Sequence, residues 1–379
     1  MNSKEALAEL RDGIDTIDTE LVQLFNKRMH ISEDIAKVKA SGNIAITDSS
    51  REEKVIQNAM SNCDESMQAE TQTLMQTIMA MSRMRQNEKL ELSDPIGIPA
   101  PALKKSTGIS VAYQGVPGAW SQRGAEVLFP GAQTSTCEYF EDVFTAVKEG
   151  RADYGVLPIE NSHTGAIGEV YDLLRRHSCY IVSQVWITAA QCLLALPHAE
   201  LTDIREVFSH PQGFTQCSRF LKNRSWDLTA CRNTAYAASM VAERGNNRYA
   251  AIGSRKAASI YGLNVLAPDI ADNKSNRTRF IAIANAPIYD DTSDITSITF
   301  STAHKSGALC SVLQSFMLSG INLSRIESRP SAAGTYRFFA DLQANANAAG
   351  DALKLAASHC EYFEVLGCYC DIAEPAYLD

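Results

Sequence analysis

The first ninety residues alternate apolar and polar positions with the period of a long amphipathic helix. Apolar side chains recur at alternating steps of three and four, at Leu7, Leu10, Ile14, Ile17, Leu21, Leu24, Ile31, Ile35 and Val38. This heptad pattern predicts one long helix packed lengthwise on a partner. Arg28 occupies the slot between Leu24 and Ile31. Because a buried guanidinium is costly unless a negative group meets it, we expect an anion beside Arg28.

The helical pattern is predicted to cover a first domain, residues 1–92. Gly42 interrupts the first helix, Asp48 is placed to cap a second, and a third begins near Glu70. A linker at 93–108 follows, because its three prolines cannot lie inside a helix.

Two further patterns divide the remaining chain. In 109–285, short apolar runs alternate with helices, which predicts an α/β domain with ligand-binding side chains at the strand ends. The expected strands are 109–113, 154–157, 205–208, 249–252 and 279–284. Residues 294–372 follow the order β-α-β-β-α-β of an α+β ferredoxin-like module, which commonly pairs with a copy of itself. Its expected strands are 295–300, 321–328, 337–344 and 365–369, and its expected helices are 308–319 and 351–359.

Composition narrows the function. The 379 residues carry a net charge of −9, which argues against nucleic acids and anionic membranes as partners. Ten cysteines are scattered without zinc-type spacing, so we expect reduced thiols in a cytoplasmic protein without a metal site. No secretory or membrane-spanning segment is predicted.

Helix geometry suggests how the cation at Arg28 is used. Arg11 lies about 25 Å from Arg28 on the same rod, so one small ligand cannot reach both. Arg11 and Lys39 occupy the same flanking heptad position. Two antiparallel copies with a dyad near Val22 would place Arg11 of one chain between Arg28 and Lys39 of the other. We therefore expect a homodimer with two cationic pockets.

The other helices offer polar partners for such a pocket. Asp48, Arg51 and Glu52 share one face, as do Ser82 and Gln86. Solvated surface charges are the alternative for Asp48 and Arg51. The whole segment 4–90 resembles the all-helical chorismate mutase family, with matches at Arg11, Arg28, Lys39, Asp48, Arg51, Glu52, Ser82 and Gln86.

The resemblance implies an intertwined homodimer that converts chorismate to prephenate without a cofactor. The rearrangement needs no nucleophile, only a folded substrate and stabilised charge on the ether oxygen. Arg11 and Arg28 would hold carboxylates, and Glu52 would position the substrate hydroxyl. Lys39 and Gln86 would donate hydrogen bonds to the ether oxygen.

Four motifs mark the middle segment. They are Gly115-Val-Pro-Gly-Ala-Trp-Ser121, Pro158-Ile-Glu-Asn-Ser162, Ser209-His-Pro-Gln212 through Gln216, and Thr278-Arg-Phe280. Their order resembles prephenate dehydratase, a two-lobed α/β enzyme that converts prephenate to phenylpyruvate with loss of carbon dioxide and hydroxide. A Ser209–His210 catalytic pair is rejected, because adjacent residues on an extended chain point opposite ways and no nucleophile-elbow glycines flank the serine.

The dehydratase resemblance implies roles for individual residues. Thr278 is the favoured hydrogen-bond donor to the leaving hydroxyl. Arg279 could pair with a substrate carboxylate or with a protein carboxylate, and Glu160 could act as an acid if desolvated. The remaining substrate-binding residues are expected to be Asn161, Ser209, Gln216 and Phe280.

The last segment resembles an ACT domain, a small amino-acid sensor. The resemblance is carried by Gly307, Ala308 and Leu309, by Asn322 and Leu323, and by Glu327, Ser328 and Arg329. It implies that L-phenylalanine binds here and biases the enzyme toward a less active state. A plain dimerisation module is the alternative.

The sequence therefore predicts a bifunctional chorismate mutase and prephenate dehydratase, inhibited by phenylalanine and dimeric or larger. One rival is an amino-acid-binding regulator, but its helical segment would present basic residues outward to DNA. The other rival is a mutase joined to an inactive dehydratase, against which the intact Thr278 argues.

Overall fold

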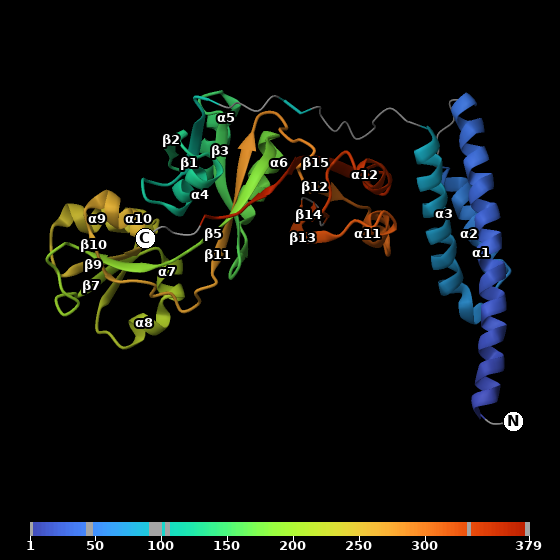
Figure 1. The fold of residues 1–379 in the computed structure, drawn as a ribbon, viewed down its shortest axis with the longest axis horizontal. Coiled ribbons are helices and arrows are strands. Elements are labelled where there is room, and N and C mark those ends of the chain that lie inside the picture. Colours follow the sequence, from blue (N-terminus) through green and yellow to red (C-terminus); the bar gives the residue numbers. More distant parts are fainter. Residues whose placement is uncertain (1–2, 43–47, 91–100, 103–106, 332–334, 376–379) are drawn as a thin grey trace. The chain divides into compact units, whose positions relative to one another are not determined.

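The computed structural model describes residues 3–42, 48–90, 101–102, 107–331 and 335–375 (Figure 1). Most of the predicted linker, 93–108, lies outside these residues. Contacts divide the chain into two compact units. The first unit comprises 1–98, 300–322 and 347–364, and the second comprises 99–299, 323–346 and 365–379. Among the described residues, no helix is long and apolar enough to cross a membrane.

The first unit is helical. Its elements are α1 Ser3–Gly42, α2 Ser49–Ser61, η1 Glu65–Met67, α3 Gln68–Leu90, α11 Ala308–Leu318 and α12 Gly350–Ala357. Both α1 and α2 pack against α3, and α12 packs against α3 and α11. Asp48 caps α2, as predicted: its carboxylate accepts a hydrogen bond from the Arg51 backbone N–H at 3.0 Å.

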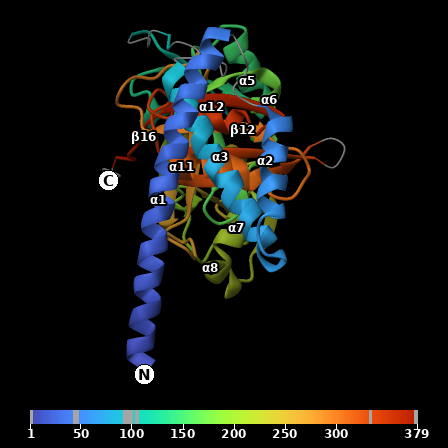
Figure 2. The same cartoon turned by 90° about the vertical axis from the view of Figure 1, so that its right-hand side faces the viewer.

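Helix α1 has two apolar faces. Helix α1 packs against α3, and its buried residues are Met29, Ser32 and Ala36. The heptad stripe from Leu7 to Val38 is exposed, and Ile35, its least exposed member, is still 43 % accessible. Figures 1 and 2 show the N-terminal half of α1 extending beyond α2 and α3. The stripe therefore has no packing partner among the described residues.

The second unit begins with a seven-stranded sheet of order β16-β5-β11-β3-β1-β2, in which β4 pairs with β3. Its strands are β1 Ser110–Gln114, β2 Gln133–Cys137, β3 Tyr154–Asn161, β4 Gly165–Ala166, β5 Tyr180–Thr188, β11 Arg277–Ala284 and β16 Asp371–Ile372. It packs against α4 Trp120–Leu128, α5 Phe140–Lys148 and α6 Gly168–His177. Successive β11 side chains enter different cores, Phe280 one and Ile281 the other.

A second lobe contains a five-stranded sheet of order β10-β6-β9-β7-β8. Its strands are β6 Cys192–Ala195, β7 Glu206–Ser209, β8 Asp227–Ala230, β9 Tyr249–Gly253 and β10 Asn264–Ala267. Its helices are α7 Pro211–Gln216, α8 Ser218–Lys222, α9 Thr234–Arg244 and α10 Arg255–Tyr261. The chain enters this lobe after β5 and leaves it before β11. The two crossings are tied together where Ala189 N donates to Asn276 O at 3.0 Å.

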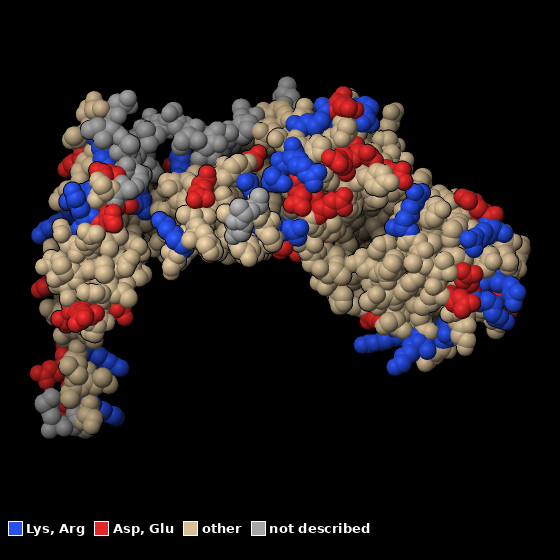
Figure 3. All heavy atoms as spheres, turned by 180° about the vertical axis from the view of Figure 1, so that it is seen from behind, with Lys and Arg blue, Asp and Glu red and all other residues tan. Residues whose placement is uncertain are grey.

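The C-terminal segment has the predicted order β-α-β-β-α-β. Its strands β12 Ile295–Ser301, β13 Leu323–Pro330, β14 Tyr336–Leu342 and β15 Tyr362–Tyr369 form a sheet of order β13-β14-β12-β15. The helices of this segment, α11 and α12, belong to the first unit. On the face shown in Figure 3, acidic and basic side chains are interspersed over the surface.

Candidate functional site

A cavity lies between the two lobes of the second unit, and we call it the lobe cavity. It is lined by Gln114, Ala119, Trp120, Ser121, Phe140, Pro158, Asn161, Thr164, Ile167, Ala189, Gln191, His210, Gln212, Gly213, Gln216, Asn233, Thr234, Thr278 and Phe280. Four residues predicted for substrate binding or catalysis are therefore brought together: Asn161, Gln216, Thr278 and Phe280. The first of the two chain crossings, between β5 and β6, contributes Ala189 and Gln191 to its wall.

Asn161 holds Thr278 in place. The two residues pair across β3 and β11, and Asn161 Nδ2 donates to Thr278 Oγ1 at 3.0 Å. Asn161 Oδ1 in turn accepts from the backbone N–H groups of His163 and Thr164 at 3.0 and 3.2 Å, which fixes the orientation of the amide. Since Thr278 Oγ1 accepts from Asn161, its own proton is left to donate into the cavity.

The wall of the lobe cavity combines apolar side chains with uncharged polar ones. None of its described lining residues is Lys, Arg, Asp or Glu. The donors on its wall are amides, hydroxyls and the first residues of α4 and α9, whose N-termini carry partial positive charge. Burial lowers the pKa of His210, and its Nδ1 accepts from Gln212 N at 3.2 Å. Such a site suits an anion held by neutral hydrogen-bond donors.

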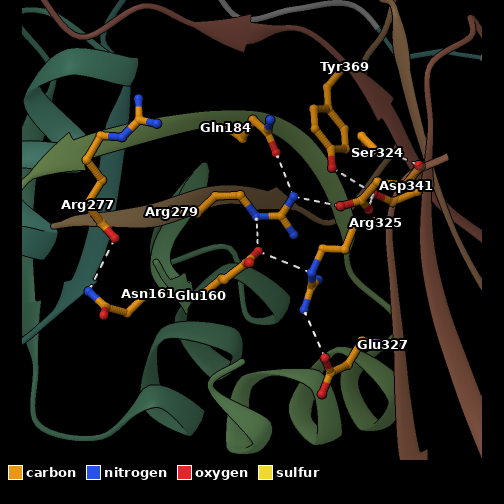
Figure 4. A network of polar contacts seen from close by, with 11 residues as sticks. Glu160, Asn161, Gln184, Arg277, Arg279, Ser324, Arg325, Glu327, Asp341 and Tyr369 are labelled. Atoms are coloured by element: carbon orange, nitrogen blue, oxygen red, sulfur yellow. Dashed lines mark hydrogen bonds and ion pairs between the residues drawn. The ribbon is translucent and has the colours of Figure 1, made fainter. Parts of the chain in front are cut away.

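Two predicted substrate-binding residues lie elsewhere. Arg279 is only 5 % exposed, and Nη1 contacts Asp341 Oδ2 at 2.6 Å and Gln184 Oε1 at 3.2 Å (Figure 4). Arg279 Nε and Arg325 Nε both approach Glu160 Oε2, at 3.4 and 3.1 Å. Neither Arg279 nor Glu160 lines the lobe cavity.

The reason is strand alternation: Thr278 and Phe280 face the cavity, so Arg279 between them faces the other side of the sheet. In this structure Arg279 pairs with the protein carboxylates of Asp341 and Glu160, which is the alternative that the sequence left open. Glu160 likewise serves as an ion-pair partner.

Ser209 was also predicted to contact substrate, and the structure places it behind the cavity wall. It is fully buried, and its hydroxyl donates to Ile252 O at 3.4 Å. A Cβ on Gly213, which does line the cavity, would lie 2.3 Å from Ser209 Oγ. Ser209 therefore supports the close approach of α7 rather than the ligand, and its oxygen makes no bond to His210.

A second cavity lies among α1, α2 and α3, and we call it the helical cavity. It is lined by Arg28, Ser32, Ile35, Lys39, Asp48, Arg51, Glu52, Val55, Met79, Ser82, Arg83 and Gln86. Seven of the eight residues predicted for the first domain are brought together here. The eighth, Arg11, is exposed on the N-terminal half of α1 and does not line this cavity in the single chain.

The charges of the helical cavity favour an anion. Its lining includes four cations, Arg28, Lys39, Arg51 and Arg83, against two carboxylates, Asp48 and Glu52. Arg28 Nη1 donates to Ser82 Oγ and to Ile78 O at 3.4 Å, so its recorded partners are neutral oxygens. Partial burial lowers the pKa of Arg28. A half-buried cation whose partners among the described residues are neutral attracts a negative ligand.

Comparisons with known proteins match the two segments of the chain that contain these cavities. The family "Chorismate mutase type II" matches residues 10–87, and "Prephenate dehydratase" matches 111–288. A bifunctional chorismate mutase/prephenate dehydratase of Escherichia coli (strain K12) is 32 % identical over 384 residues, which cover 97 % of each chain. The chain belongs to the family of bifunctional chorismate mutase/prephenate dehydratases. It therefore carries a mutase and a dehydratase activity of phenylalanine biosynthesis.

Two further relatives concern the dehydratase part. The Arabidopsis thaliana protein "Arogenate dehydratase/prephenate dehydratase 2, chloroplastic" is 40 % identical over 283 residues, 71 % of this chain and 74 % of that one. A prephenate dehydratase from Arthrobacter aurescens, solved in complex with L-Phe, has a TM-score of 0.64 and 29 % identity. The structural match covers 69 % of this chain and 90 % of the Arthrobacter chain.

Sequence reasoning missed several lining residues of this bifunctional enzyme. In the helical cavity it missed Arg83, which forms an ion pair with Glu52. In the lobe cavity it missed Gln191, whose Nε2 donates to Gln216 Oε1 at 3.1 Å. Gln191 follows a strand end, a position that could have flagged it. Arg83 gave no such signal, since charged residues on helices are usually solvated.

The residues predicted to sense phenylalanine fall in both units. Gly307 caps α11 with φ 80°, and Ala308 and Leu309 begin that helix in the first unit, which also includes Asn322. Leu323, Glu327, Ser328 and Arg329 belong to β13 in the second unit. There, Glu327 Oε2 lies 3.8 Å from Arg325 Nη2, and Arg329 Nη2 lies 4.0 Å from Asp172 Oδ2.

Proposed function

We propose that the helical cavity is the mutase site and that a second copy of the chain completes it. Arg28 and the partner's Arg11 hold the two carboxylates of chorismate in the folded shape needed for rearrangement. Lys39 and Gln86 stabilise the negative charge that develops on the ether oxygen. Glu52 positions the substrate hydroxyl, while Asp48, Arg51 and Ser82 complete the wall. The supporting observation is the gathering of seven of these residues around one cavity.

The exposed apolar stripe of α1 supports the dimer. A contiguous apolar surface of this length, from Leu7 to Val38, is unfavourable in water and marks an interface. The heptad spacing fits a helix of a second copy, packed antiparallel. Arg11 lies on this same rod, so the interface that covers the stripe also brings Arg11 to the other chain's cavity.

The lobe cavity is proposed as the dehydratase site. Prephenate loses its ring carboxylate as carbon dioxide, and the electron pair of that bond moves into the ring as the hydroxyl leaves. Thr278 donates a hydrogen bond to the departing hydroxyl, and aromatisation supplies the driving force. Asn161 orients Thr278, Gln216 and Gln191 contact the substrate, and Phe280 packs against its ring. Substrate charge is met by neutral donors and by the N-termini of α4 and α9.

The C-terminal segment is proposed to be an ACT domain through which L-phenylalanine inhibits the enzyme. The element order β-α-β-β-α-β supports this, as does the bound L-Phe of the structurally similar dehydratase. Glu327 lies beside Arg325, which in turn contacts Glu160 next to Asn161 (Figure 4). A ligand that draws Glu327 away would change the contacts beside Asn161.

One experiment tests the assignment of the two sites. Chorismate turnover by the full chain is followed for both prephenate and phenylpyruvate, with and without phenylalanine. Arg28→Ala should abolish rearrangement and leave the dehydration of supplied prephenate intact. Thr278→Ala should do the reverse. Loss of both activities in either variant, with the fold retained, would contradict two separate sites. Unchanged phenylpyruvate formation in the presence of phenylalanine would contradict the proposed inhibition.

A further inference from the structure

The end of helix α12 lies against α3 within the first unit. Helix α12 packs on α3, and Gln314 of α11 donates from Nε2 to Thr77 Oγ1 of α3 at 2.8 Å. His359 follows α12 and reaches Arg83: its Nε2 lies 3.3 Å from Arg83 Nη2. The C-terminal segment thus contacts a residue that lines the helical cavity.

Arg83 connects this contact to the mutase site. Its side chain is 11 % exposed, and its Nη1 forms an ion pair with Glu52 Oε1. It lines the helical cavity beside Ser82 and Gln86 of the same helix. A buried guanidinium holds a fixed position only where its hydrogen-bond donors meet acceptors. Here one terminal nitrogen meets a carboxylate and the other meets an imidazole nitrogen.

His359 can accept a hydrogen bond because it is neutral. Burial, with the nearby positive charge of Arg83, lowers the pKa of His359 to about 4. Glu52 opposes this shift and Lys305 adds to it. A neutral imidazole carries one acceptor nitrogen, and arginine can only donate. Nε2 of His359 is therefore the acceptor, and its proton resides on Nδ1.

The geometry points to Arg83 and His359 as positioning residues for the rearrangement. His359 fixes the guanidinium of Arg83, and Arg83 fixes the carboxylate of Glu52 that faces chorismate. This inference rests on the proposed mutase site. Neither residue is among those that the family resemblance supplied, and they are 276 positions apart. Part of the mutase site is thus held in place by the segment proposed to sense phenylalanine.

The test uses the full chain and measures kcat and KM for chorismate, with dehydration of supplied prephenate as a control for folding. His359→Leu keeps the volume and removes the acceptor, so kcat/KM for the rearrangement should fall about tenfold, as for contacting coupled residues. His359→Gln should restore the rate, because its amide oxygen can lie where Nε2 lies. His304→Leu, the same change at an exposed histidine of this segment, should have no effect.

A double-mutant cycle separates positioning from general stability. His359→Leu should have no further effect on rearrangement in an Arg83→Met background. An equal effect in both backgrounds, or a wild-type rate for His359→Leu, would overturn the inference. If His359→Leu fails to fold, the rearrangement rates of His359→Gln and His359→Asn are compared instead. Glutamine can place its acceptor near the position of Nε2, whereas asparagine places it near Nδ1. Equal rates in these two variants would also overturn the inference.

The proposed mutase site is tested separately by Glu52→Gln. A normal mutase rate in Glu52→Gln would refute the assignment of Glu52 itself. A slow Glu52→Gln together with an unaffected His359→Leu would refute only the role of His359.

Discussion

Asn161 Nδ2 donates to Thr278 Oγ1 at 3.0 Å across the paired strands β3 and β11. The amide is itself fixed by two backbone N–H groups. Threonine has one proton to donate, so a hydroxyl that accepts from Asn161 directs that proton to another acceptor. We propose that in the lobe cavity this acceptor is the departing hydroxyl of the substrate.

Thr278→Val should therefore slow dehydration of supplied prephenate by about 100-fold or more, the range lost with a general acid. The valine keeps the shape of threonine, so folding and mutase rate should be unchanged. Phenylpyruvate formation followed by absorbance measures the first rate, and chorismate consumption measures the second. Thr202→Val, at an exposed position of the second lobe, is the matched control. A normal dehydratase rate in Thr278→Val would remove this hydroxyl from the chemistry.

Arg11→Met and Arg28→Met should each abolish the mutase rate, because each removes one clamp on the dianion. Mixed after joint refolding, the two inactive variants should recover about a quarter of wild-type activity, since half of the dimers would carry one intact site of two. Dehydration of prephenate checks that the mixture has refolded. If the mixed sample stays inactive while its dimers form normally, Arg11 does not act across the interface.

Glu327→Ala should weaken inhibition of the dehydratase by phenylalanine without changing its uninhibited rate. The carboxylate lies beside Arg325 on β13 and outside the lobe cavity. The measurement is the phenylalanine concentration that halves the rate on supplied prephenate. Glu361→Ala, at an exposed glutamate of the same segment, should retain wild-type sensitivity. Equal sensitivity in both variants would place the sensor elsewhere.

The depressed pKa of His359 predicts a pH effect on stability. With a folded pKa of about 4 against an ordinary 6.5, the unfolded chain binds more protons between these values. The folded state should therefore lose stability as the pH falls from about 6.5 toward 4. His359→Gln should remove this component. Urea unfolding at several pH values, followed by helix content, gives the unfolding free energy of the wild type and of His359→Gln. If the two free energies depend on pH in the same way, His359 does not contribute this pH effect.

The helical cavity could be predicted in part from the sequence, because apolar side chains recur every three to four residues along the first helix. That period placed Arg28 in a slot of the apolar stripe, and the family resemblance supplied its neighbours on α2 and α3. Arg83 and His359 could not be found this way. Their contact joins helix α3 to a segment hundreds of positions later, and no local pattern encodes such a pairing.

The second unit shows another limit of sequence reading. Thr278-Arg-Phe280 was assigned to one site as a block, although alternation along a strand sends its middle residue to the opposite face. Strand β2, Gln133–Cys137, was not predicted, because its side chains are mostly exposed and polar. Strand β2 lies at a sheet edge. Strands β5 and β6, which lie inside their sheets, were not predicted either.

The pairing of β16 with β5 has a consequence for how the enzyme is made. Asp371–Ile372 add a parallel edge strand to a sheet whose other members end at Ala284, and Glu374 accepts a hydrogen bond from Thr188 N at 2.9 Å. During translation, the β5 edge therefore waits unpaired until almost ninety further residues have left the ribosome. Ribosome-bound chains released before residue 371 would expose this edge to aggregation, whereas later release would let the sheet close.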